Sequence, residues 1–101
     1  MALDFHRFDN NEHLFGLDDK QYAHLENLFV EFKQKTGIYI DPYRDSRLSV
    51  DHQKIMLKII DAWIDIADLN KDKPKTIIVI WFRTLMGYFS SKSIDIKILG
   101  D

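Results

Sequence analysis

The feature that most constrains the fold of this 101-residue chain is the apolar segment from Thr76 to Ser91. Its first part, Ile77 to Phe82, is an unbroken apolar run whose β-branched residues are compatible with a buried strand over residues 76–82. The polar residues of the segment, however, fall seven or eight positions apart, so a helix gathers them on one stripe. These residues are Thr76, Arg83, Thr84, Ser90 and Ser91. The spacing predicts a central helix that is apolar on most of its circumference, with Pro74 at its first position.

Two further helices are predicted upstream. The first runs from about Asp18 to Thr36, because Asp18 and Gln21 are spaced as a capping box and Gly37 suits the left-handed position after a helix. Apolar residues recur along it at steps of three and four. The second runs from about Ser49, an N-cap residue, to Leu69, with apolar side chains on one face and charged ones on the other.

The C-terminal residues have the period of a strand. Ile94, Ile96 and Ile98 alternate with two charged residues, which is typical of a half-buried strand. Such a strand needs a partner, and the candidates are Leu3 to Phe8 and Ile38 to Ile40. The predicted fold class is therefore mainly α, of the α+β kind.

The predicted architecture is a three-helix core around Trp63 and Trp81, with a short β element from the C-terminal strand. Residues 1–101 are long enough for a single domain. The other aromatic side chains, Phe8 and Tyr88 among them, are assigned to the core because that is the usual place of aromatic residues at amphipathic spacing.

Composition excludes several classes of protein. The chain has no cysteine, so it has no disulfide, thiolate nucleophile or cysteine-ligated metal. A hydrophobic content of 46% and a net charge of −2 exclude a disordered chain. The N-terminal residues lack the basic and apolar regions of a signal peptide, and the longest apolar run is far shorter than the roughly 20 residues that span a bilayer. We therefore expect a soluble, cytoplasmic protein.

Motifs that carry chemistry are also absent from the sequence. The four histidines form no i, i+4 pair, and His52 makes a poor acid–base couple with its chain neighbour Asp51. The segment from Asp41 to Asp45 resembles the start of a calcium loop but fails at the later ligand positions. No two glycines lie close enough to form a phosphate loop. We expect no enzymatic activity, no metal and no cofactor.

Nucleic-acid binding is not favoured either. Arg44 and Arg47 lie close to Tyr43, and basic plus aromatic residues are able to hold single strands. The neighbouring Asp41 and Asp45 dilute this positive charge. The preferred interpretation is an intramolecular arginine–aspartate network that orders the loop, with no direct contact to nucleic acid or to a membrane.

The class of function that remains is recognition of another protein. The segment from Gly37 to Leu48 holds tyrosine and arginine residues, which are enriched at protein interfaces. A second candidate is a row of aspartates near the end of the second helix, where the helix dipole disfavours acidic residues. A third is the stretch of residues 1–19, with five acidic residues and one basic residue. Ordinary solvated surface is the alternative for all three.

The residues 36–48, T-G-I-Y-I-D-P-Y-R-D-S-R-L, precede a helix in a compact, mildly acidic chain without cysteine. In these respects the chain resembles the small cytoplasmic immunity proteins of contact-dependent inhibition and polymorphic toxin systems. The resemblance implies a protein that binds a cognate toxin domain and blocks its active site. Many toxins of that kind are nucleases with basic clefts, so it also implies a nuclease inhibitor.

The predicted function is thus neutralisation of a bacterial toxin by a protein that is a monomer rather than a homo-oligomer. The candidate partner-binding residues are Tyr39, Asp41, Tyr43, Arg44, Asp45, Arg47, Asp61, Asp65 and Asp68. The alternative is a homo-oligomeric adaptor or assembly protein that pairs with its copies through the strand from Ile94 to Leu99.

Overall fold

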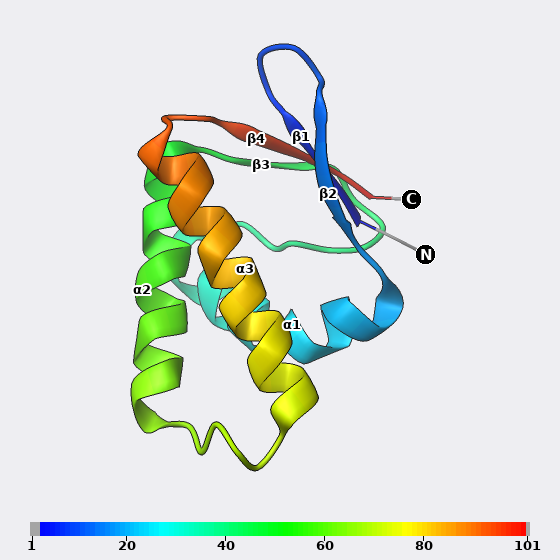
Figure 1. Cartoon of the computed structure of the whole chain (residues 1–101). Coiled ribbons are helices and arrows are strands. Elements are labelled where there is room, and N and C mark those ends of the chain that lie inside the picture. Colours follow the sequence, from blue (N-terminus) through cyan, green and yellow to red (C-terminus); the bar gives the residue numbers. More distant parts are fainter. Residues whose placement is uncertain (1–2, 101) are drawn as a thin grey trace.

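The structure is a computed structural model that describes residues 3–100. Its helices are α1 (Asp19–Thr36), α2 (Val50–Ile66) and α3 (Lys73–Ser91). Its strands are β1 (Leu3–Arg7), β2 (His13–Leu17), β3 (Ser46–Leu48) and β4 (Ile96–Leu99). The strands form one antiparallel sheet in the order β2-β1-β4-β3, and the helices lie together on one side of it (Figure 1).

The predicted fold class was wrong about the sheet. The chain has an α+β fold with a four-stranded sheet, not a mainly helical fold with one short β element. The expected strand at the C-terminus is present as β4, and its predicted partner near the N-terminus is β1. Ile38 to Ile40, the other candidate partner, forms no strand, although Ile40 is fully buried.

The strand β2 escaped prediction because its sequence alternates poorly. Phe15 and Leu17 face the core, but the register with β1 shifts between Phe5 and His6, and this irregularity breaks the two-residue period. Gly16 adds no side chain to the pattern. β2 is instead specified by its pairing with β1. The sequence of β2 alone does not reveal that pairing.

The N-terminal caps of α1 and α2 and the C-terminal cap of α1 are those predicted. In contrast, α2 ends at Ile66, short of the predicted Leu69, and α3 begins at Lys73, which places Pro74 at its second position. Asp18 and Gln21 make both hydrogen bonds of the capping box, and Gly37 is left-handed with φ 78°. The Ser49 hydroxyl accepts a hydrogen bond from the His52 backbone N–H at the start of α2. These caps satisfy backbone groups that the first and last turns of a helix leave without partners.

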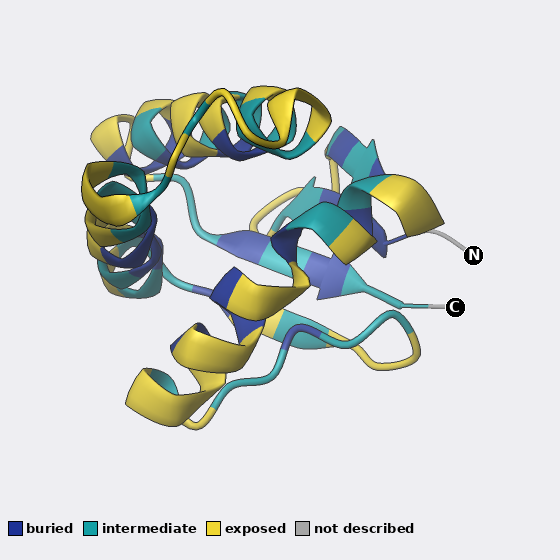
Figure 2. Ribbon diagram, turned by 90° about the horizontal axis from the view of Figure 1, so that it is seen from below, coloured by how far each residue is buried: buried dark blue, intermediate teal, exposed yellow. Residues whose placement is uncertain are grey.

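The core lies between the helices and one face of the sheet, and Figure 2 shows the buried residues turned toward this space. Phe82 of α3 is its centre, because this ring meets Phe5 and Phe15 of the sheet and Phe29 of α1 with centroid distances of 5.6 to 6.2 Å. Phe5 and Phe15 stack at 4.2 Å. Aromatic contacts therefore join the two layers.

Several expectations about the core need correction. Residues 76–82 are helical, but α3 is a surface helix and not a central one, with Ile77 and Tyr88 exposed. Trp63 and Trp81 are only partly buried at the edge of the core. Phe8, also assigned to the core, is exposed and lies against the guanidinium of Arg47. The sheet provides the apolar centre that the helices alone were expected to provide.

Two polar side chains tie α2 to the sheet. The amide nitrogen of Gln53, which is fully buried, donates to the carbonyls of Leu48 and Ile94 at 3.1 and 2.7 Å. The Asp95 carboxylate accepts from the Val50 backbone N–H and from Arg47. The start of α2, the end of β3 and the approach to β4 are thus held as one unit.

We expect Phe82→Ala to lower the free energy of unfolding by about 3–5 kcal/mol, because it leaves a cavity where sheet and helices meet. Chemical denaturation measures the change. Tyr88→Ala removes another aromatic ring of α3, at an exposed position, and should change stability by about 0.5 kcal/mol or less. Equal effects of the two variants would contradict the assignment of the core.

Candidate functional site

The best candidate site is built on the segment that joins α1 to β3. Residues 37–45, which we term the edge loop, run alongside β3, the strand at one edge of the sheet (Figure 1). Six of the nine candidate residues from the sequence lie in this loop or in β3. These six residues can form a binding surface only if the loop is ordered and rigid.

The edge loop is anchored in the core at its middle. Ile40 is fully buried, and its carbonyl accepts a hydrogen bond of 2.8 Å from the Tyr22 hydroxyl of α1. The same hydroxyl lies 3.4 Å from that of Tyr39. Burial, and next the neighbouring Tyr39, raise the pKa of Tyr22 above its ordinary value, so this hydroxyl stays a donor.

The tip of the edge loop is a turn stabilised by Asp41. Its carboxylate accepts from the Tyr43 backbone N–H at 2.9 Å, and its carbonyl accepts from the Arg44 N–H at 3.2 Å. The Arg44 guanidinium lies 3.8 Å from the Asp41 carboxylate. This is the arginine–aspartate contact expected within the loop, whereas Arg47 pairs with Asp95 outside it.

The C-terminal end of the described chain holds the other side of the loop. The Gly100 N–H donates to the Asp45 carboxylate at 3.1 Å. A Cβ atom at Gly100 would lie 2.5 Å from the Arg44 backbone nitrogen and 2.7 Å from the Pro42 carbonyl, so only glycine fits there. The loop is therefore fixed against α1, the core and the segment after β4.

Large side chains project from this fixed loop. Tyr43 is 67% exposed, and the side chain of Arg44 is 78% exposed. Tyrosine and arginine combine contact area with directed hydrogen bonds, and they carry a large share of binding energy at interfaces. A rigid loop that presents both is suited to recognise another protein.

Two hollows adjoin the exposed residues. The first, of about 510 Å³, is lined in part by Tyr39, Asp41, Arg44 and Asp45. Ile38 and Ser46 line both hollows, so the two are neighbours along the edge of β3. The second, of about 500 Å³, is mostly apolar. Its lining residues are Ile38, Ser46, Arg47, Ser49 and His52.

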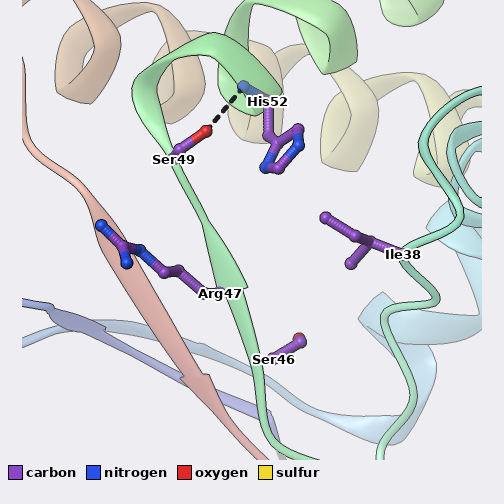
Figure 3. Close-up of a pocket in the computed structure, with 5 residues that line it drawn as sticks. All are labelled: Ile38, Ser46, Arg47, Ser49 and His52. Carbon is purple, nitrogen blue, oxygen red and sulfur yellow. Dashed lines mark hydrogen bonds between the residues drawn. The ribbon is translucent and has the colours of Figure 1, made fainter.

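The second hollow contains two buried polar atoms without hydrogen-bond partners, the Ser46 Oγ and the His52 Nδ1. In Figure 3 the side chains of Ser46 and His52 lie on the side of β3 that faces Ile38, whereas Arg47 points away. Buried polar atoms are rarely left unpaired, so these two atoms are unused hydrogen-bonding capacity beside the hollow. The hollow joins an apolar wall to two such atoms.

Sequence reasoning missed these two residues. It weighed His52 only with Asp51, its chain neighbour, and gave Ser46 no role. Their meeting depends on the turn from β3 into α2, where Ser49 caps the helix and directs His52 toward the edge loop. This proximity arises from the tertiary structure, so no motif defined by sequence spacing identifies it.

The acidic residues do not form one surface with the edge loop. Asp61 pairs with Arg83 of α3 at 2.5 Å, and this pairing raises the pKa of Arg83. Asp61 and Asp65 line a separate hollow between α2 and α3, while Asp68 accepts from the Asn70 N–H beyond α2. The row thus lies toward the C-terminal end of α2, and the edge loop adjoins its N-terminal end.

The acidic N-terminal stretch is largely paired as well. Within it Asp4 lies 3.1 Å from the His13 imidazole, and Asp9 binds Arg7 at 3.0 Å. The pairing lowers the pKa of Asp9. These residues belong to the β1–β2 hairpin, which offers less free negative charge than its composition indicated.

Within residues 3–100, no group of three or more histidine, aspartate or glutamate side chains is placed to hold a metal ion. None of the three helices is long and apolar enough to cross a membrane. No protein-family model, curated protein or solved structure matches this chain. Function is therefore inferred from the chain's own residues.

We expect Tyr22→Phe to lower the free energy of unfolding by about 1–3 kcal/mol at neutral pH, because the buried Ile40 carbonyl loses its donor. The pKa of Tyr22 is raised in the folded state, so its contribution is complete below the ordinary value of 10.0 and is lost as the pH rises above it. Urea denaturation of both proteins should show a stability difference that shrinks above pH 10. Equal stability at neutral pH would contradict the anchoring role of Tyr22.

Proposed function

We propose that this protein binds another protein through the edge loop and β3, and that the partner is a bacterial toxin domain that it neutralises. The observation that carries the proposal is a fixed loop with exposed Tyr43 and Arg44 beside two adjoining hollows. The unpartnered Ser46 and His52 atoms in one hollow add hydrogen-bonding capacity that the chain itself does not use.

Preorganisation favours tight binding at this surface. Ordering a loop during association reduces affinity, and the contacts of Ile40, Asp41 and Gly100 order this loop in the free protein. A partner therefore gains the contacts of Tyr43 and Arg44 without first fixing their backbone. This matches a capture protein better than a flexible linker.

The residues that line the two hollows indicate which chemical groups of a partner would fit them. The first hollow holds both charges, with Lys33 and Arg44 near Asp41 and Asp45, and it suits a mixed polar contact. The second suits a side chain with an apolar body and a hydrogen-bonding end, because its apolar wall stands near the free atoms of Ser46 and His52. Both features are typical of protein recognition.

The toxin identity rests on the resemblance to immunity proteins, which lies in residues 36–48 and thus in the same segment as the proposed surface. The carboxylates of Asp65 on α2 and of Asp68 just beyond it would steer a basic partner such as a nuclease over longer range. On this proposal the protein works in the cytoplasm as a binding protein without catalytic activity or cofactor, and without contact to nucleic acid or membrane.

The alternative of assembly through the C-terminal strand meets a structural obstacle. β4 lies inside the sheet, with β1 paired along one edge and β3 along the other. A strand bound on both edges offers no backbone groups to a second copy. Capture of a partner through the edge loop is thus the better supported of the two functions.

The test is co-expression in a bacterial host with the toxin domain encoded beside this chain, together with binding measurements on the purified pair. We expect the wild-type protein to restore growth, and Tyr43→Ala and Arg44→Ala each to weaken binding by about thirtyfold or more. Tyr88→Ala, a matched change at an exposed tyrosine of α3, should leave toxin binding unchanged.

Two outcomes would overturn the proposal. If the wild-type protein neither binds nor protects, the toxin partner is wrong. If it binds but the variants at Tyr43 and Arg44 bind equally well, the edge loop is not the surface. Charge reversal of Asp61, Asp65 and Asp68 tests the other surface, and as steering residues they should slow association in a salt-dependent way without abolishing binding.

A further inference from the structure

The hairpin of β1 and β2, residues 3–17, carries a pair of histidines that the proposed function does not use, and its turn projects beyond the rest of the sheet (Figure 1). His6 of β1 and His13 of β2 lie directly opposite each other in the antiparallel ladder. Their ring centroids are 5.0 Å apart, and the ring planes are inclined at 83°. Side chains at opposed positions of two strands are close enough to hold one ligand together.

An irregularity in the ladder creates this pair. Up to Phe5, which faces Phe15, the pairing is regular, and its continuation would set Leu14 opposite His6. The register shifts between Phe5 and His6, so that His13 takes this position instead. Such shifts re-aim side chains and are over-represented next to functional sites. The irregularity thus brings the two imidazoles together.

Each histidine uses one ring nitrogen in a hydrogen bond. His6 Nδ1 lies 3.1 Å from the Asn11 carbonyl oxygen, and His13 Nε2 lies 3.1 Å from the Asp4 carboxylate. Both partners are acceptors, so in the neutral rings these nitrogens carry the proton. The lone pairs then belong to His6 Nε2 and His13 Nδ1. Metal-binding histidines are held in this way, with the other ring nitrogen donating to a carbonyl or a carboxylate.

We propose that His6 and His13 together bind a divalent transition-metal ion of the kind that prefers imidazole, such as Cu²⁺, Ni²⁺ or Zn²⁺. A metal–nitrogen bond is about 2.1 Å long, so two imidazoles on one ion at a tetrahedral angle have centroids about 5 Å apart. The 5.0 Å between the two rings meets this requirement. Binding therefore needs at most a change in ring orientation, and water takes the other positions around the ion.

The surroundings of the pair suit a cation from solvent. The hairpin holds three acidic residues and one basic residue. The side chains of His13 and of its partner Asp4 are 54% and 42% exposed. Lys97 of β4 lies opposite His6, but its ammonium is bound by the Asn11 side chain. An ion thus reaches the imidazoles from water and lies near a carboxylate.

The sequence-based expectation of no metal rests on i, i+4 spacing and on known motifs, whereas these two histidines meet through strand pairing. Two protein ligands hold an ion less tightly than the three or four of zinc enzymes and zinc fingers, so we expect an exchangeable ion. β2 occupies the edge of the sheet opposite β3, so the inference does not rest on the proposed function.

Isothermal titration calorimetry with CuCl₂ tests the site, because Cu²⁺ binds nitrogen ligands most tightly among the divalent first-row metals. His6→Gln and His13→Gln should each weaken binding at least about tenfold. The matched control is His24→Gln, which removes a histidine of α1 and should leave the affinity unchanged. Circular dichroism checks that the variants are folded.

Pulsed electron paramagnetic resonance of the copper complex counts the bound imidazoles and gives a second readout. We expect two imidazoles in the wild-type protein and in His24→Gln, and fewer in His6→Gln and in His13→Gln. Absence of copper binding at about 1 mM CuCl₂ would overturn the inference. Binding that His6→Gln and His13→Gln leave unchanged would overturn it too, and a single imidazole on the ion in the wild-type protein would overturn the joint role of the pair.

Discussion

The insertion of β4 between β1 and β3 is the contact on which the rest of the structure depends. Ile96 and Ile98 of this strand are fully buried, so the last strand of the chain completes both the sheet and the core. Residues next to it extend its influence. Asp95, just before β4, holds Arg47 and the start of α2, and Gly100, just after it, holds the edge loop. Loss of this strand would therefore free the candidate site as well as unfold the sheet.

The same contact explains how the molecule separates its surfaces. The edge loop lies beside β3 and the segment just after β4, and it presents tyrosine, arginine and hydrogen-bonding hollows. The hollow lined by Asp61 and Asp65 lies apart from it, between α2 and α3.

Local features were predicted well from the sequence, and contacts between distant segments were not. The capping box of Asp18 and Gln21, the Gly37 cap and the Ser49 cap depend on residues within one turn, so spacing alone reveals them. β3 and β2 depend on their partners, and neither alternates clearly enough to be seen alone. Ile38 to Ile40 had β character, yet the buried Ile40 anchors a loop, because β3 occupies the edge of the sheet next to it.

The candidate site was also predicted only in part: the residues that are close in sequence were found, and those brought together by the fold were not. Tyr39, Asp41, Tyr43, Arg44 and Asp45 do share one loop, because they are close in sequence. Asp61 and Asp65 lie one helical turn apart on α2, as periodicity indicates, whereas Asp68 lies beyond the end of the helix at Ile66. Asp61 also pairs with Arg83 through an interhelical contact that periodicity does not reveal. Ser46 and His52 meet beside Ile38 only after β3 and α2 are placed, so no one-dimensional pattern identifies them.

The central claim is that the recognition surface is already formed in the free protein. Amide hydrogen exchange measured by NMR on the isolated chain tests it most directly, at the backbone N–H groups of Tyr43, Arg44 and Gly100, each of which donates a hydrogen bond that fixes the edge loop. The account predicts exchange at least about a hundredfold slower than in an unstructured peptide. Exchange at the rate of an unstructured peptide at all three positions would show that the loop is not preformed, and would contradict the account.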